Sequence, residues 1–250
     1  MYNLLISIAA SILVYVLTNQ LGLDWWQALP PALMVLIALY LYLSRRLWKQ
    51  VELQIKDAYK ILEPFSQRTD LAHQVDKRNT LIDEAIKKIK LGYRLAKWQF
   101  LVKSQLDAQI GIILFSVKQD LSGALPYLEK AKNGRNWQAQ AMLAVVYMKK
   151  HKPELMSETF EFAVRLNKKQ DLLWNLYAFC LQKIKQQEKA IEVLIRAKKI
   201  LPANKPIIDN LVLLQNNKKM KMKAYGEQWY QFQLEKPPMQ KTKKPRFSRR

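Results

Sequence analysis

Two uncharged, apolar runs near the amino terminus constrain the fold of this chain more than any other feature. The first covers residues 2–18 (YNLLISIAASILVYVLT) and the second residues 25–44, and neither contains Asp, Glu, Lys or Arg. Because an α-helix rises about 1.5 Å per residue, the runs would span about 26 Å and about 30 Å. These lengths are close to the thickness of the hydrocarbon core of a bilayer. The two runs therefore predict a pair of membrane-spanning helices.

The charges beside the two runs predict how the pair is oriented. The connecting segment, residues 19–27, contains a glycine and two adjacent tryptophans but no Lys or Arg, whereas Arg45, Arg46 and Lys49 follow the second run at once. Tryptophan is common at the membrane–water interface, and basic residues remain on the cytoplasmic side. We therefore expect residues 1–46 to form a transmembrane helical hairpin with both termini in the cytoplasm.

Two alternatives fit the apolar runs less well. A cleaved signal peptide has Lys or Arg in its first residues and small residues at the cleavage site, and neither feature is clear here. Two buried helices of a soluble protein would not be expected to end in the basic sequence SRRLWK, residues 44–49.

The next segment, residues 47–102, is predicted to be a helical connector. Apolar residues recur at helical spacing over residues 47–63, which indicates a helix that continues out of the second span until Pro64 stops it. Residues 64–70 (PFSQRTD) have the composition of a loop, and residues 71–102 are expected to be helical again.

From about residue 103 the chain repeats itself with a period near 34 residues. Ala131, Ala163 and Ala197 mark equivalent places in three successive units and are 32 and 34 residues apart. In the first unit, residues 104–136, the two halves are offset from one another by one residue. In the last unit, counted from Asp171 as position 1, the pattern is formed by Trp174 (position 4), Ala178 (8), Ala190 (20), Leu194 (24), Ala197 (27) and Pro202 (32).

This pattern resembles the tetratricopeptide repeat (TPR), and the two preceding spans resemble the membrane-anchored bacterial type of that family. Small residues at positions 8, 20 and 27 let two helices pack closely, and bulky residues fill the space between them. The unit 137–170 departs from the pattern at Gln140, Met156 and Lys168. The resemblance implies an all-α protein in which a TPR-like α-solenoid, residues 103–206, follows the transmembrane hairpin.

The resemblance also implies a concave groove, lined by the first helix of each unit, that binds a peptide or a partner helix. A mixed groove with a basic edge suits an amphipathic or acidic peptide, although the same residues could be ordinary surface residues. The Lys and Asn clamp that some members use for a terminal carboxylate is absent. The matching positions are Gln138, Ala141, Val145, Met148 and Lys149 in one unit, and Leu172, Asn175, Phe179, Gln182 and Lys183 in the next.

Residues 207–236 are expected to cap the carboxy-terminal end of the repeats, beginning with one more helix over 207–223. The part from 221 to 238 (KMKAYGEQWYQFQLEKPP) interleaves lysines with aromatic residues, a pattern that also fits nucleic-acid binding or a membrane-surface anchor.

Three of these aromatic residues, Tyr225, Trp229 and Phe232, would share one face of a helix, whereas alternation of apolar and polar residues after Trp229 would suit a strand. The pattern leaves both structures open. Because a repeat stack needs its terminal apolar surface covered, we interpret these three residues as a structural cap.

Residues 237–250 are expected to be a basic, disordered tail that follows the double proline. Near an anionic leaflet each basic residue would add about 1 kcal/mol of attraction, so the tail could contact anionic lipid. Its basic residues are Lys241, Lys243, Lys244, Arg246, Arg249 and Arg250.

Composition restricts the class of function. The 42 Lys and Arg residues against 20 Asp and Glu give a formal charge of +22, which favours anionic partners. Most of the basic residues are lysines, which are less suited than arginines to reading bases. The sequence shows no phosphate-binding glycine loop and no pair of catalytic residues. Cys180 is the one cysteine and is expected to be an inert, packed thiol, and the two histidines are far apart, so no cofactor or metal is expected.

The sequence therefore predicts a membrane-anchored TPR adaptor or scaffold, and not an enzyme. We expect it to bind partner proteins at the cytoplasmic face of a bacterial inner membrane, as a multi-pass protein of a cell-envelope, secretion or export assembly. The assembly is implied only by the architectural resemblance. The alternative is a membrane-tethered RNA- or ribosome-binding basic protein, although we do not expect a nucleic-acid partner.

Overall fold

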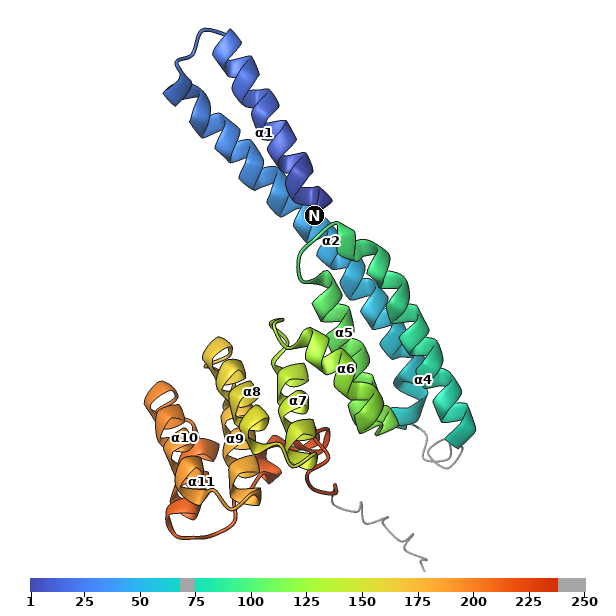
Figure 1. Ribbon diagram of the computed structural model, residues 1–250, viewed down its shortest axis with the longest axis vertical. Coiled ribbons are helices and arrows are strands. Elements are labelled where there is room, and N and C mark those ends of the chain that lie inside the picture. The colour runs from blue at the N-terminus through green and yellow to red at the C-terminus, as the bar shows by residue number, and fades with distance from the viewer. Residues whose placement is uncertain (68–74, 238–250) are drawn as a thin grey trace, which may run out of the picture. The chain divides into compact units, whose positions relative to one another are not determined.

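The computed structural model describes residues 1–67 and 75–237 of the chain (Figure 1). Within these residues the regular structure is helical throughout and contains no strand. The all-α class predicted from the sequence is thus confirmed. The chain divides into two compact units, residues 1–159 and 160–250.

The amino-terminal unit begins with α1 (Tyr2–Gln20) and α2 (Trp25–Gln67), which pack side by side (Figure 1). The Ser11 hydroxyl joins the two helices midway, because it donates a hydrogen bond to the Ala32 carbonyl oxygen at 2.8 Å. The turn between them contains Gly22 at a φ of +88°, a conformation that glycine adopts readily. Both helices are long and apolar enough to cross a membrane.

The second helix is longer than the apolar run that begins it. It continues without interruption for 43 residues, so the helix predicted over residues 47–63 is its second half. The prediction that Pro64 stops this helix is wrong, since the helix ends three residues later at Gln67. A proline removes only its own backbone donor, so the residues after it can still donate to the carbonyl oxygens four positions earlier.

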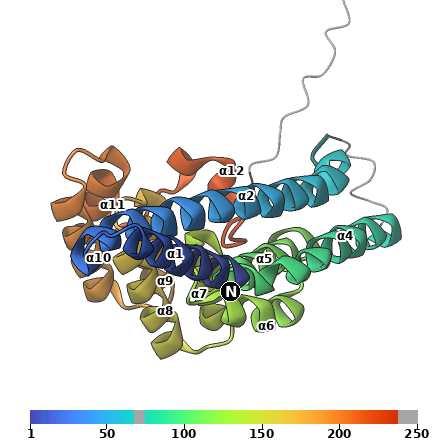
Figure 2. The same ribbon diagram turned by 90° about the horizontal axis from the view of Figure 1, so that it is seen from above.

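The chain then returns along α2 through α4 (Val75–Lys90), which packs against the second half of α2 (Figure 2). The prediction of helix over residues 71–102 holds from Val75 to Lys90. The helix continues to Lys97 as a 3₁₀ helix, η1 (Leu91–Lys97), and the prediction is wrong only for the turn 98–101 that precedes α5 (Val102–Ile112). Residues 71–74 lie outside the described residues.

A glycine allows η1 to pack closely on α5. A Cβ atom at Gly92 would lie 3.1 Å from the two Cδ atoms of Leu106. The turn ends at Leu101, which has a left-handed φ of 66° and precedes the first residue of α5. The α-helix of α4 thus gives way to the 3₁₀ segment next to Gly92, where η1 packs closely on α5.

The helix α5 passes into a π-helical segment, η2 (Ile113–Lys118), before α6 (Leu121–Ala131) begins. A π-helical turn contains more residues than an α-helical turn. The extra residue accounts for the offset of one residue between the two halves of the unit 104–136. At Gly111 an added Cβ would lie 2.6 Å from the Leu128 side chain, so the glycine permits close packing of α6 on α5.

From residue 137 onward the helix boundaries recur at intervals of 34 residues. Three helices begin at 137, 171 and 205, and two begin at 153 and 187. The period read from the sequence is therefore present in the structure, although the last helix ends at Gln215 and not at 223. These helices are α7 (Trp137–Lys149), α8 (Pro153–Leu166), α9 (Asp171–Lys183), α10 (Gln187–Ile200) and α11 (Lys205–Gln215).

In the carboxy-terminal unit, α10 packs against both α9 and α11. The small residues of the repeat pattern, Ala178, Ala190 and Ala197, are fully buried. Cys180 is also fully buried, and burial raises the pKa of its thiol, so the thiolate that would make it reactive is suppressed.

The unit ends with two very short helices, η3 (Lys223–Tyr225) and α12 (Glu227–Tyr230). The region that includes the three predicted cap residues therefore forms neither a long helix nor a strand. Both patterns seen in the sequence are replaced by turns, which bring Trp229 and Phe232 into the interior.

Candidate peptide-binding groove

One half of the predicted groove lies on α9, and in the structure it is covered. Leu172, Asn175 and Phe179 are at most 4% exposed, whereas Gln182 is half-buried and Lys183 is exposed. Side chains that face a groove would normally be open to solvent. Here Asn175, Phe179 and Gln182 contact residues 218–235 of the same chain, which we call the covering segment.

Two side-chain amides hold the start of the covering segment by its main chain. The Asn210 Oδ1 accepts a hydrogen bond from the Lys221 N–H at 2.8 Å, and its Nδ2 donates to the Lys221 carbonyl oxygen at 3.3 Å. The Gln182 Oε1 accepts from the Met220 N–H at 3.2 Å, and its Nε2 donates to the Lys218 carbonyl oxygen at 3.0 Å. Both amides bind peptide groups of the covering segment, and contacts of this kind depend little on peptide sequence.

A buried polar network joins Asn210 to the first turns of α9. Asn175 is fully buried; its Nδ2 donates to the Tyr225 hydroxyl oxygen at 2.8 Å and its Oδ1 accepts from the Asn210 Nδ2 at 2.8 Å. The Asp171 Oδ2 accepts from the Tyr225 hydroxyl at 3.2 Å and from the Asn204 Nδ2 at 2.9 Å. Burial, together with the Asp171 carboxylate, raises the pKa of Tyr225 and keeps its hydroxyl protonated as a donor.

Aromatic residues anchor the rest of the covering segment. Trp229 and Phe232 are fully buried, and the Trp229 ring meets the Phe179 ring edge to face with centroids 4.7 Å apart. The Trp229 Nε1 donates to the Glu235 Oε2 at 2.8 Å. Of the three predicted cap residues, Tyr225 is half-buried in the polar network and the other two lie in the interior. Rings that are fully buried cannot stack on the bases of a nucleic acid.

The other half of the predicted groove lies on α7, in the amino-terminal unit. Ala141 and Val145 are fully buried and offer no surface to a partner, whereas Gln138, Met148 and Lys149 are half-buried. Burial lowers the pKa of Lys149, whose ammonium lies 5.6 Å from the centroid of the Phe115 ring. The basic tail predicted from Lys241 to Arg250 lies outside the described residues.

The residues that organise the covering segment were not all identified from the sequence. Asp171, Asn204 and Asn210 were missed as parts of the site, although Asn175 and Gln182 were predicted to line the groove. A signal was present at Asn210, which follows Asp209 and precedes an apolar run within α11. A buried amide in such a position normally has hydrogen-bond partners, because burying it without them is unfavourable.

No protein-family model, no curated protein and no solved structure matches this chain.

Proposed function

We propose that this protein is a membrane-anchored adaptor of the tetratricopeptide-repeat type that binds partner proteins through the groove on its helical repeats. The observation that carries the proposal is the binding of the main chain of residues 218–221 by Gln182 and Asn210. Paired amides that hold peptide groups suit an extended segment of a partner protein. The 34-residue recurrence of the helix boundaries supports the repeat assignment.

The covering segment occupies the groove in the free protein. A partner's segment therefore competes with residues 218–222 for the same amides, and binding requires that the covering segment be displaced. The affinity for a partner is reduced by the free energy of this displacement. The groove is thereby protected from non-specific association.

The amino-terminal helices support the membrane anchor. Their outward side chains are large and apolar: Leu5 and Leu13 are each 59% exposed, and Met34 is 71% exposed. Such surface is unfavourable in water and is removed from water in a bilayer. The basic residues after the second apolar run favour a multi-pass protein of a bacterial inner membrane with both termini in the cytoplasm. The order of the parts favours a cell-envelope, secretion or export assembly.

Photocrosslinking in native membranes tests the groove. The full-length chain with a photoreactive amino acid at Lys183, an exposed residue at the groove edge, is expected to give discrete protein adducts that ribonuclease does not remove. Lys198 is exposed on α10 and provides the matched control. Equal adducts from both positions would contradict the groove, and adducts removed by ribonuclease would favour the RNA- or ribosome-binding alternative.

Cysteine labelling tests the orientation of the anchor. Leu21 is 82% exposed in the turn between α1 and α2, and the native Cys180 is buried, so Leu21→Cys provides a single reactive thiol. A membrane-impermeant maleimide is expected to label Leu21→Cys in intact spheroplasts. The exposed control Lys150→Cys is expected to react only after the membrane is permeabilised. The reverse pattern would contradict cytoplasmic termini.

A further inference from the structure

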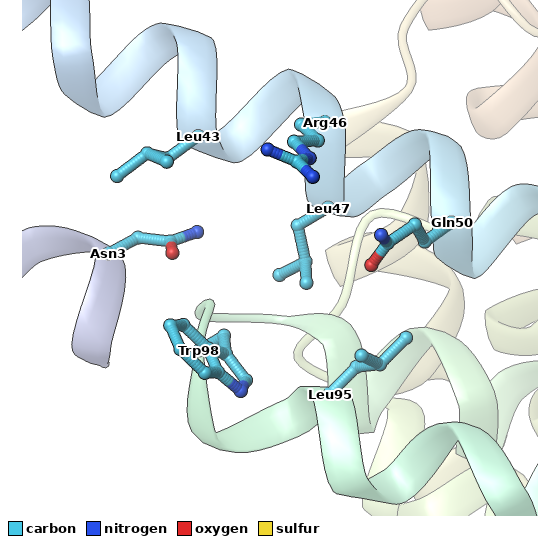
Figure 3. Close-up of a pocket in the computed structure, with 7 residues that line it drawn as sticks. All are labelled: Asn3, Leu43, Arg46, Leu47, Gln50, Leu95 and Trp98. Carbon is cyan, nitrogen blue, oxygen red and sulfur yellow. The ribbon is translucent and has the colours of Figure 1, made fainter.

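The amino-terminal unit contains a cavity of about 370 Å³. It lies beside the first turn of α1 and the point on α2 where the apolar run ends (Figure 3). Residues from the start of α1, the middle of α2 and the end of η1 surround it, and their side chains converge on one space (Figure 3). The lining combines leucines and a tryptophan with two amides and one cation. It consists of Asn3, Leu43, Arg46, Leu47, Gln50, Leu95 and Trp98.

Hydrogen bonds fix the turn 98–101 at the level of the last residues of the apolar run in α2. The Gln99 Nε2 donates to the Tyr40 hydroxyl oxygen at 2.9 Å, and its Oε1 accepts from the Ser44 hydroxyl at 3.2 Å. The same Oε1 accepts from the Asn3 Nδ2 at 3.3 Å, which adds the first turn of α1. Gln99 is only 9% exposed, so this junction is a packed part of the fold.

The turn nevertheless presents apolar side chains to the outside. Trp98, Phe100 and Leu101 are 41%, 45% and 48% exposed. The helices beside them also present apolar side chains on their outer faces. Leu101 also adopts a left-handed φ of 66°, which is unfavourable for a leucine. Three adjacent exposed apolar residues indicate that this surface is adapted to an apolar environment.

The surroundings of the cavity are strongly basic. Arg46 lines it and forms no ion pair with any described residue, and Arg45 and Lys97 lie beside the lining residues in the sequence. The segments that meet here, residues 1–23, 25–51 and 85–106, contain no Asp or Glu. The site therefore combines positive charge with apolar surface.

We propose that this cavity binds an acidic phospholipid of the cytoplasmic leaflet, with the lipid phosphate at Arg46 and its glycerol and acyl carbons against the leucines. The proposal rests on the proposed membrane anchoring. A guanidinium binds phosphate through two parallel hydrogen bonds, and the exposed Gln50 amide supplies a donor for a remaining headgroup oxygen. Trp98, Phe100 and Leu101 lie in the interfacial layer, where aromatic and aliphatic side chains are favourable.

This site would do more than add affinity for the membrane. Because Gln99 bonds to α2 and α1, a lipid held at Arg46 and Trp98 fixes the connector against the leaflet.

Native mass spectrometry of the full chain in detergent tests lipid binding. Titration with phosphatidylglycerol is expected to leave one bound lipid per chain, and phosphatidylcholine with the same acyl chains is expected to bind less. Arg46→Gln should weaken phosphatidylglycerol binding about tenfold, as expected for the loss of a charge-assisted contact. Arg45→Gln removes the same charge outside the cavity and is the matched control; equal losses in both variants would overturn the site. Loss of the lipid on addition of inorganic phosphate would identify a free-phosphate site and overturn the lipid assignment.

Fluorescence quenching in liposomes tests the position of the turn. A fluorophore on Phe100→Cys is expected to be quenched by spin-labelled phospholipid, whereas one on Lys77→Cys, in the distal first turn of α4, is not. The buried Cys180 leaves the introduced thiol as the reactive one. If the chain resists carbonate extraction but Phe100→Cys is not quenched, the lipid proposal is wrong and the anchoring stands. If carbonate releases the chain, both are wrong.

Discussion

Replacing Trp229 with alanine is expected to lower the free energy of unfolding of the carboxy-terminal unit by about 3–5 kcal/mol. The indole is fully buried and packs edge to face on Phe179, so alanine would leave a cavity that neighbouring side chains can fill only in part. The substitution would also remove the hydrogen bond that the Trp229 Nε1 donates to the Glu235 Oε2 at 2.8 Å. The effect can be measured by urea denaturation of the full chain. Unfolding is monitored by the rate at which Cys180 reacts with a maleimide.

Tyr230→Ala provides the matched control for this substitution. Tyr230 is the adjacent aromatic residue and is only half-buried, so its loss should change stability much less. Trp229→Phe should fall between the two, because it keeps an aromatic contact with Phe179 and loses the hydrogen bond. Equal transition midpoints for Trp229→Ala and Tyr230→Ala would rule out the interpretation of Trp229 as a structural cap.

Asn210→Ala is expected to release the covering segment from the groove. The substitution leaves the Lys221 N–H and carbonyl without their partner, and it leaves the buried Asn175 Oδ1 without a donor. A lost hydrogen bond weakens a structure by about 1 kcal/mol, and a buried unsatisfied acceptor by about 1–3 kcal/mol. Amide hydrogen exchange at Met220 and Lys221 should therefore accelerate about tenfold or more.

The control for this experiment is Asn216→Ala. Asn216 lies at the end of the same helix, and its Nδ2 donates to the Val212 carbonyl oxygen without contacting the covering segment. Exchange at Lys221 should be unchanged in this variant. In Asn210→Ala, photocrosslinking from Lys183 should also increase, because partners no longer compete with the covering segment. Unchanged exchange at Lys221 in Asn210→Ala would show that the amide does not hold the segment.

The parts of the fold that follow from local patterns could be predicted from the sequence. The helix starts at 137, 153, 171 and 187 recur with the 34-residue period, and small residues return at several of the matching positions, such as Ala144 with Ala178 and Ala163 with Ala197. The apolar runs likewise mark α1 and the first half of α2 by composition alone. In both cases the information lies within the segment itself.

The break between α4 and α5 could not be predicted in this way. The segment before it has apolar residues at helical spacing, and only its packing changes it into a 3₁₀ segment and a turn. Gly92 fits against Leu106, and Gln99 bonds to Ser44, a residue 55 positions earlier. Contacts over such distances leave no periodic signal in the local sequence.

The contacts of α9 show the same limit. The sequence predicted that Asn175 and Gln182 line a groove, and in the structure both side chains bond to residues 218–225. That residues 218–222 fill this surface depends on the turn after α11, which returns Lys221 to Asn210. The helix pattern and the strand pattern near Trp229 both fit the local sequence. In the structure neither pattern is adopted, and the Trp229 ring is buried.

The uninterrupted course of α2 has a mechanical consequence. On the proposed anchoring, the helix leaves the bilayer near Ser44 and extends a further 35 Å or so as a rigid rod, at about 1.5 Å per residue. Membrane-spanning helices change their tilt to match bilayer thickness, and a change of about 20° would move the end of such a rod by about 12 Å. On this anchoring, the helix would act as a lever that converts the thickness of the surrounding lipid into the position of the connector it supports.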